Sequence, residues 1–81
     1  MRISTREAVK MIARRAGKSL GQLSGEVTGS TPAAFVNMVA RGSMKMGVGA
    51  KVAEQCGYAL MFVPIELKDM IEEGIEIKAE V

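Results

Sequence analysis

The stretch that decides the expected fold is residues 19–41, which read SLGQLSGEVTGSTPAAFVNMVAR. Ser19 is followed three residues later by Gln22, and this pair is a capping-box pattern that marks the start of a helix. Apolar residues then recur at helical spacing, so we predict a helix over residues 20–27. The apolar positions of this helix are Leu20, Leu23 and Val27.

A Gly-containing turn at residues 28–30 separates this helix from a second one. Thr31 is a preferred N-cap residue, and Pro32 suits the first helical position because its missing N–H has no partner there. The second helix is predicted to reach Arg41 and to stop at Gly42. Its apolar face consists of Phe35, Met38 and Val39. Two short helices joined by such a turn form the element that places a recognition helix in the major groove of DNA.

Two glycines, Gly21 and Gly25, lie inside the first of these helices. Each costs about 1 kcal/mol relative to Ala in a helix interior. We therefore expect a structural reason for both, and we predict that it is close approach of the second helix.

The flanking segments predict two further helices. Ser4 and Glu7 form another capping-box pattern, and residues 5–16 then show helical apolar spacing up to Gly17. Residues 46–56 are expected to form a fourth helix. Its inward positions are Val48, Val52, Ala53 and Cys56.

The C-terminal third changes character. Residues 58–63 are nearly all apolar and rich in β-forming residues, and Pro64 ends the run, so a strand is predicted there. Apolar spacing in residues 67–71 outlines a short helix, and the alternation of residues 75–81 predicts a second, half-buried strand. The expected fold class is therefore mainly α, with four to five helices and a small C-terminal β element. Residues 1–57 form the helix-turn-helix domain, and residues 58–81 form a strand-helix-strand extension.

Composition excludes several classes of protein. The 81 residues suffice for one domain, and no apolar run approaches the ~20 residues that span a bilayer, so no membrane partner is expected. Residues 1–18 lack the apolar region of a signal peptide, and the single Cys56 forms no internal disulfide. These features predict a cytoplasmic protein in which Cys56 is a core residue.

The charge is distributed unevenly along the chain. Residues 1–51 carry nine Lys or Arg against two Glu, for +7, whereas residues 52–81 carry two Lys against seven Asp or Glu, for −5. A basic N-terminal part suggests a polyanionic partner, although for the charge alone a solvated surface is the favoured explanation of either half.

Four short segments carry a family resemblance. Residues 4–12 read STREAVKMI, residues 19–24 read SLGQLS, residues 40–42 read ARG, and residues 51–58 read KVAEQCGY. Over residues 4–63 the chain resembles the phage repressor and Cro-type, xenobiotic-response-element-like, helix-turn-helix family. The resemblance implies a repressor-like domain that binds double-stranded DNA to regulate transcription in a phage or prophage, without a cofactor.

The resemblance also implies which residues contact DNA. In that family the N-terminal half of the second motif helix reaches base edges, while the start of the first and the loop after the second hold phosphates. Carried over by position, the base-facing residues are Thr31, Ala33, Ala34 and Asn37. The phosphate-facing residues are Ser19, Arg41, Ser43 and Lys45.

This chain departs from the family pattern in two ways. The turn at residues 27–31 is one residue longer than the turn of the family. The assignment of DNA-contacting residues by position is therefore displaced by up to one residue. Small apolar residues also stand where the family places Arg, Gln or Asn. The second hypothesis is therefore a protein-interaction module, as in an anti-repressor or inhibitor. It would present Pro32, Ala33, Ala34 and Met38 to a protein partner.

Catalysis and metal binding have little support. The chain has no His to act as a base, and no second Cys or His that could form a zinc site with Cys56. Residues 42–49 are rich in glycine but lack the ending of a phosphate-binding loop. The acidic side chains of residues 66–73 suit a solvated amphipathic helix. We predict a protein that is not an enzyme.

Two residue groups have simple structural explanations. Arg6, Lys10 and Arg14 form an i, i+4 stripe, and a solvated face is favoured for it over a binding surface. The methionines at helical core spacing are expected to fill gaps in the core. They are Met11, Met38 and Met70.

The C-terminal extension is expected to make the protein a homodimer. A strand as apolar as residues 58–63 requires cover on both faces, and so small a chain offers little to cover the second face. Pairing with a second copy would supply it. An intramolecular hairpin in a monomer is the alternative.

Overall fold

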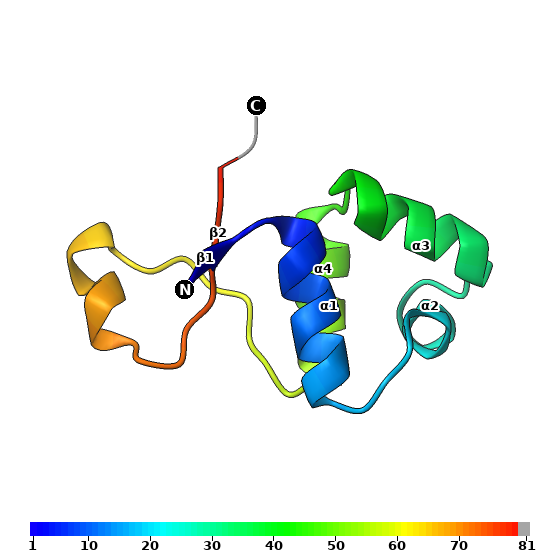
Figure 1. Ribbon diagram of the computed structural model, residues 1–81, viewed down its shortest axis with the longest axis horizontal. Helices are drawn as coiled ribbons and strands as arrows, with labels where there is room; N and C mark the ends of the chain where they lie inside the picture. Colours follow the sequence, from blue (N-terminus) through cyan, green and yellow to red (C-terminus); the bar gives the residue numbers. More distant parts are fainter. Residues whose placement is uncertain (80–81) are drawn as a thin grey trace.

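Four α-helices carry the fold of the computed structural model, which describes residues 1–79 (Figure 1). They are α1 (Thr5–Arg15), α2 (Leu20–Val27), α3 (Pro32–Arg41) and α4 (Met46–Gln55). The bounds of α2 and α3 agree with the prediction, and α1 and α4 each end one residue earlier than predicted. The mainly helical fold class is confirmed.

Three of these helices, α1, α2 and α3, begin where the hydroxyl of Ser4, Ser19 or Thr31 accepts a capping hydrogen bond from the backbone. The Ser4 hydroxyl accepts from the Glu7 backbone N–H at 3.2 Å, and the Glu7 carboxylate accepts from the Ser4 N–H, so this capping box is complete. The Ser19 hydroxyl accepts from the Gln22 N–H at 3.0 Å. The Gln22 side chain, however, accepts no hydrogen bond from the Ser19 backbone N–H, and its amide donates to Glu26, so only half of the second predicted box forms.

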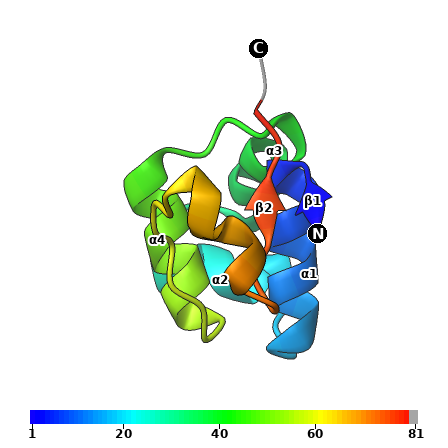
Figure 2. The ribbon, with the colours of Figure 1, turned by 90° about the vertical axis from the view of Figure 1, so that its left-hand side faces the viewer.

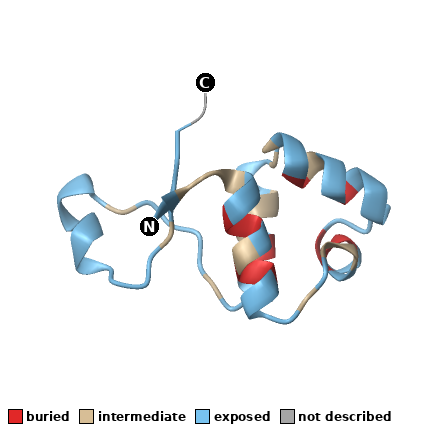
Figure 3. Ribbon diagram, in the orientation of Figure 1, coloured by how far each residue is buried: buried red, intermediate tan, exposed pale blue. Residues whose placement is uncertain are grey.

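The core lies where the inner faces of all four helices meet (Figure 3). Leu23, Phe35, Val39 and Val52 have at most 1% of their surface exposed. Cys56 belongs to the same cluster, as predicted, and Met38 and Val48 pack against it while partly buried. The α2 helix contacts both α3 and α4, so the helix-turn-helix is anchored by the rest of the domain.

The two glycines of α2 have different surroundings. A Cβ atom at Gly21 would lie 3.8 Å from the Cβ atom of Pro32, so α3 does approach this side of α2. A Cβ atom at Gly25 would meet nothing within 4 Å. The prediction of close approach was therefore wrong for Gly25, which is exposed on the outer side of α2.

The β element differs from the predicted one. Residues 58–63 form no strand; they connect α4 to the 3₁₀ helix η1 (Ile65–Met70). The second predicted strand is reduced to β2 (Glu76–Ile77), which pairs in parallel with β1 (Arg2–Ile3). The run at 58–63 has high β propensity but no neighbouring backbone with which to pair. Part of the predicted tail strand, residues 80–81, lies outside the described residues.

The β1–β2 pair joins the N-terminus to the C-terminal segment (Figure 2). The Glu76 N–H donates to the Met1 carbonyl at 2.7 Å, and the Lys78 N–H donates to the Ile3 carbonyl at 2.8 Å. We call residues 58–79 the C-terminal arm. Figure 1 shows η1, in the arm, on the opposite side of α1 and α4 from α2 and α3.

Apolar side chains in the arm are left largely in solvent. Met70 is 76% exposed, so its predicted role as a core residue was wrong. The spacing of residues 67–71 does define an apolar face, but among residues 1–79 no other element covers it. Within residues 1–79, no helix has both the length and the apolar composition needed to cross a bilayer.

Candidate nucleic-acid interface

The candidate interface is the outer face of α3. Phe35 and Val39 are buried, and this fixes the rotation of the helix about its axis. Ala33, Asn37 and Arg41 are spaced four residues apart and are all exposed, so they form one outward stripe.

Asn37 lies in the middle of this stripe. Its side chain is exposed and makes no hydrogen bond with the described part of the chain. An amide offers one acceptor and two donors, so it can pair with two atoms of an adenine edge at once. Ala33 and Ala34, also exposed, lie in the first turns of the same helix and offer only methyl groups.

Thr31 and Ser19 are exposed at the first turns of the two motif helices. The Thr31 hydroxyl caps α3 by accepting from the Ala34 N–H at 3.3 Å, and Ser19 caps α2 in the same way. Both oxygens are acceptors in these caps, so each hydroxyl hydrogen remains available to donate to an acceptor such as a phosphate oxygen.

Three of the predicted phosphate-facing residues follow one another closely along the chain. Arg41 is in the last turn of α3, and Ser43 and Lys45 lie in the loop that leads to α4. All three are exposed, and neither cation forms an ion pair with another described residue. The Ser43 N–H donates to the Met38 carbonyl at 3.2 Å, which fixes the course of the loop.

Lys45 has an unusual position for a cation. It is the N-cap residue of α4, and its side chain makes no capping hydrogen bond. A positive charge beside the positive end of a helix dipole is unfavourable unless an anion lies close by. An anion at this place would interact favourably with both Lys45 and the first turn of α4.

The structure groups the eight predicted residues into two sets. Thr31, Ala33, Ala34, Asn37 and Arg41 lie on α3 and its cap, and Ser43 and Lys45 extend this surface along the following loop. Ser19 lies on another helix, at the start of α2, where Gly21 approaches Pro32 of α3.

The sequence prediction omitted two residues on α3. Val36 is 40% exposed and Ala40 is exposed, so both share the outer surface of this helix. The helical period could have identified them, because Phe35 and Val39 already define the buried side. They make this surface more apolar than the eight predicted residues imply.

The three ion pairs of the described residues lie elsewhere. Lys18 and Glu26 form one at 2.9 Å, and the hydrogen bond from Lys18 lowers the pKa of the Glu26 carboxyl. Glu76 pairs with Arg2 at 3.8 Å and with Lys68 at 3.2 Å. The exposed stripe of Arg6, Lys10 and Arg14 on α1 has no acidic partner among residues 1–79.

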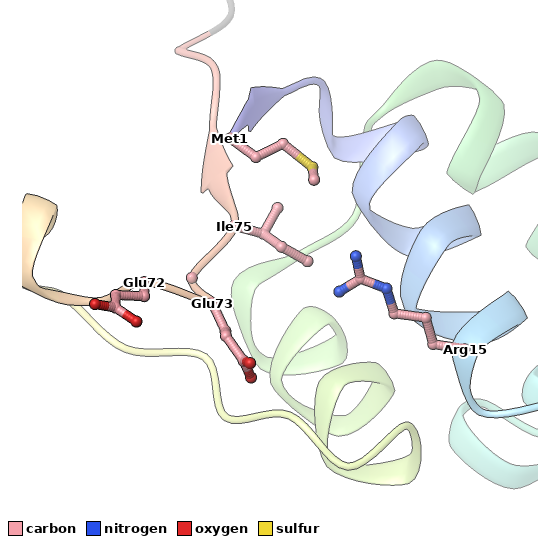
Figure 4. Close-up of a pocket in the computed structure, with 6 residues that line it drawn as sticks. Met1, Arg15, Glu72, Glu73 and Ile75 are labelled. Carbon is pink, nitrogen blue, oxygen red and sulfur yellow. The ribbon is translucent and has the colours of Figure 1, made fainter.

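Two open clefts flank α1, and neither involves α3. The first, of about 360 Å³, lies between α1 and the arm and is lined in part by Arg15, Glu73 and Ile75 (Figure 4). The second, of about 320 Å³, lies along α1 itself. Among the described residues, no group of three His, Cys, Asp or Glu side chains is placed to hold a metal ion.

Comparison of this chain with protein-family models, with curated proteins and with solved structures found no match.

Proposed function

We propose that this protein is a sequence-selective, double-stranded DNA-binding transcription regulator that inserts α3 into the major groove. The observation that carries the proposal is the α2–turn–α3 unit, whose exposed outer helix ends at Arg41 and is followed by Lys45 at the start of α4. Neither cation forms an ion pair with another described residue. A helix is the right size for the major groove, and basic groups beside it would meet the flanking phosphates.

Phosphate binding supplies most of the affinity in this proposal. Arg41 and Lys45 neutralise phosphates and release condensed counterions, and the hydroxyls of Ser19 and Ser43 donate to phosphate oxygens. No cofactor takes part. The affinity therefore falls as the salt concentration rises, with a slope set by the number of phosphates contacted.

Base recognition rests on few groups. Asn37 pairs with an adenine, and the methyl groups of Thr31, Ala33 and Ala34 contact thymine methyl groups. One bidentate amide contact contributes about 1–3 kcal/mol of discrimination against the wrong base. A single α3 therefore recognises a short site with modest selectivity.

A homodimer would overcome this limit. Two-fold symmetry places two copies of α3 in successive major grooves, about 34 Å apart, so that they read a palindromic site together. We therefore propose a homodimer as the DNA-binding unit.

The direct test uses fluorescence anisotropy on duplexes selected from a random pool, repeated over a range of salt concentrations. Arg41→Ala and Lys45→Ala should each weaken binding to all duplexes about equally and reduce the salt slope by about one. Lys78→Ala is the control, because it removes the same charge from an exposed side chain outside α3 and η1 that forms no ion pair with another described residue. Binding that does not depend on salt would contradict the proposal.

A second candidate function is a protein-interaction module. It is favoured by the apolar surface of α3, where Pro32, Ala33, Ala34 and Val36 are exposed. Met38, which the sequence had included in this surface, is half-buried against the core instead. Under this alternative, Val36→Asp abolishes capture of a protein partner, and random duplexes yield no enriched sequence.

A further inference from the structure

The C-terminal arm exposes an unusual amount of apolar surface. Eight large apolar side chains between residues 60 and 77 are 41–87% exposed. Phe62, at 87%, is the most exposed of them. The others are Leu60, Met61, Ile65, Leu67, Met70, Ile71 and Ile77.

The area involved is that of a protein interface. With roughly 200 Å² for a fully exposed large side chain, these residues leave about 1,000 Å² of apolar surface in solvent. Each partner in a standard stable interface contributes about 800 Å². The arm alone therefore exposes enough apolar surface for one side of a dimer.

Unpaired carboxylates accompany these apolar side chains. Glu66 and Asp69 lie on η1 beside Ile65 and Met70, which are both 76% exposed. Neither carboxylate forms an ion pair with another residue in the described part of the chain. The outer surface of η1 is thus both apolar and negatively charged.

The cleft along α1 is also apolar but carries the opposite charge. It is lined by Ile3, Glu7, Lys10, Met11 and Arg14 and has a volume of about 320 Å³. Ile3 and Met11 are half-buried and supply an apolar floor, while Lys10 and Arg14 are exposed cations without an acidic partner among residues 1–79. Both the apolar content and the charge of this cleft complement the surface of η1.

We infer that the arm of one copy docks through η1 on the α1 cleft of a second copy, and that the exchange is reciprocal. Glu66 and Asp69 then face Lys10 and Arg14, and Phe62 with its neighbours covers the apolar floor. Reciprocal contacts of this kind close a two-fold symmetric dimer. The inference deepens the proposed homodimer and rests on it, but it does not depend on DNA binding.

A second copy fits this cleft better than a nucleic acid does. The apolar side chains that line the cleft, Ile3 and Met11, offer no hydrogen-bond donor to a phosphate chain, whereas they can pack against the apolar side chains of η1. Docking of η1 would instead bury apolar surface from both sides and give four unpaired charged groups a partner.

The test is a charge exchange monitored by analytical ultracentrifugation of the full chain. The unaltered protein should sediment at twice its 8.6 kDa monomer mass at micromolar concentration. The Lys10→Glu/Arg14→Glu variant and the Glu66→Lys/Asp69→Lys variant should each weaken the dimer by about tenfold or more, because like charges then face each other. Combining all four changes should restore association to near the original strength. Circular dichroism checks that each variant remains folded.

Matched apolar variants test the rest of the surface. Phe62→Ser should weaken the dimer, whereas Met46→Ser, which changes a 65% exposed side chain on α4, should leave it intact.

A monomeric unaltered protein, or a fourfold variant no more dimeric than its parents, would overturn the inference. The inference would also be overturned if the Lys10→Glu/Arg14→Glu variant lost affinity for DNA while its dimer stayed as strong as that of the unaltered protein. If the unaltered protein binds no duplex from the random pool while the charge exchange succeeds, the proposed DNA function fails and the docking stands.

Discussion

The guanidinium of Arg15 donates a 2.8 Å hydrogen bond to the phenolic oxygen of Tyr58. This contact joins the last residue of α1 to the first residue of the C-terminal arm. The Tyr58 side chain is half-buried against the core, so its hydroxyl is the polar end of an otherwise apolar anchor. Together with Ile75 and the β1–β2 pair, it attaches an arm that is otherwise exposed.

Tyr58→Phe should loosen the arm without unfolding the domain. The change removes one hydrogen bond, worth about 1 kcal/mol or less, and keeps the ring in place. We expect a small fall in melting temperature and faster hydrogen exchange at the Glu76 and Lys78 amides, which hold β2 to the N-terminal strand. Unchanged exchange at these two amides would show that the β1–β2 pair holds the arm without help from Tyr58.

Phe35→Ala should lower the free energy of unfolding by about 3–5 kcal/mol, because the side chain is fully buried and leaves a large cavity. Phe35→Leu gives a smaller loss and remains measurable if the Ala variant does not fold. The adjacent Val36→Ala, on the exposed side of the same helix, should change stability by about 0.5 kcal/mol at most. Urea denaturation compares the three. Equal losses at the two positions would contradict the observed rotation of α3.

The helices could be predicted because their signals are local. Ser19 and Thr31 each cap a helix with their own side chain, and Gly42 ends α3 with a φ of 64°. These signals depend only on residues within one or two turns. The outer face of α3 follows in the same way, since Phe35 and Val39 are apolar at positions four apart.

The β element could not be predicted in full because its partners are distant in the sequence. Arg2 pairs with Glu76, and Ile3 pairs with Ile77. Two-residue strands are too short to show a period of two. Residues 58–63 do have strand composition, but composition alone does not supply a neighbouring backbone.

Periodicity also does not reveal whether an apolar face is covered. Met38 and Met70 both lie at helical core spacing, yet Met38 packs against the core and Met70 is 76% exposed. The difference comes from the position of η1, which projects beyond α1 and α4. The sequence already indicated the C-terminal extension as the dimerisation region, but the structure was required to show which of its apolar side chains are exposed.

Cys56 should react slowly with thiol reagents in the folded protein. Burial raises the pKa of the Cys56 thiol, so less of the reactive thiolate is present and the reagent reaches it poorly. Labelling with a chromogenic disulfide at pH 8 should be slow in buffer and fast in urea. Ser43→Cys, which adds a thiol in the exposed loop after α3, should react at once and serves as the control. Fast native labelling of Cys56 would mean that α4 frays at its C-terminal end.

Glu26 should make the stability depend on pH in the acidic range. The hydrogen bond from Lys18 holds the pKa of Glu26 below its unfolded value of about 4.3. This contribution is therefore fully present above that value and is lost as the pH falls through the lower folded pKa. Glu26→Gln and Lys18→Met should each lower the melting temperature at pH 7. Each should also remove the part of the fall in melting temperature at acidic pH that comes from the Lys18–Glu26 pair. A parallel decline in both variants and the unaltered protein would contradict this role.

Asn37→Ala should alter the DNA sequence preference while leaving the fold intact. The side chain is exposed and free of hydrogen bonds within the described residues, so its removal costs the domain little. In the proposed complex it reads one adenine, and its loss should reduce discrimination at that base pair by about 1–3 kcal/mol. Selection from a random duplex pool, run beside the unaltered protein, should show one position in each half-site losing its preference. Arg41→Ala is the matched comparison, because loss of a phosphate contact weakens all sequences equally and preserves their ranking. If Asn37→Ala keeps both ranking and affinity, this residue does not contact bases, and the apolar surface around Val36 becomes the better guide to what α3 binds.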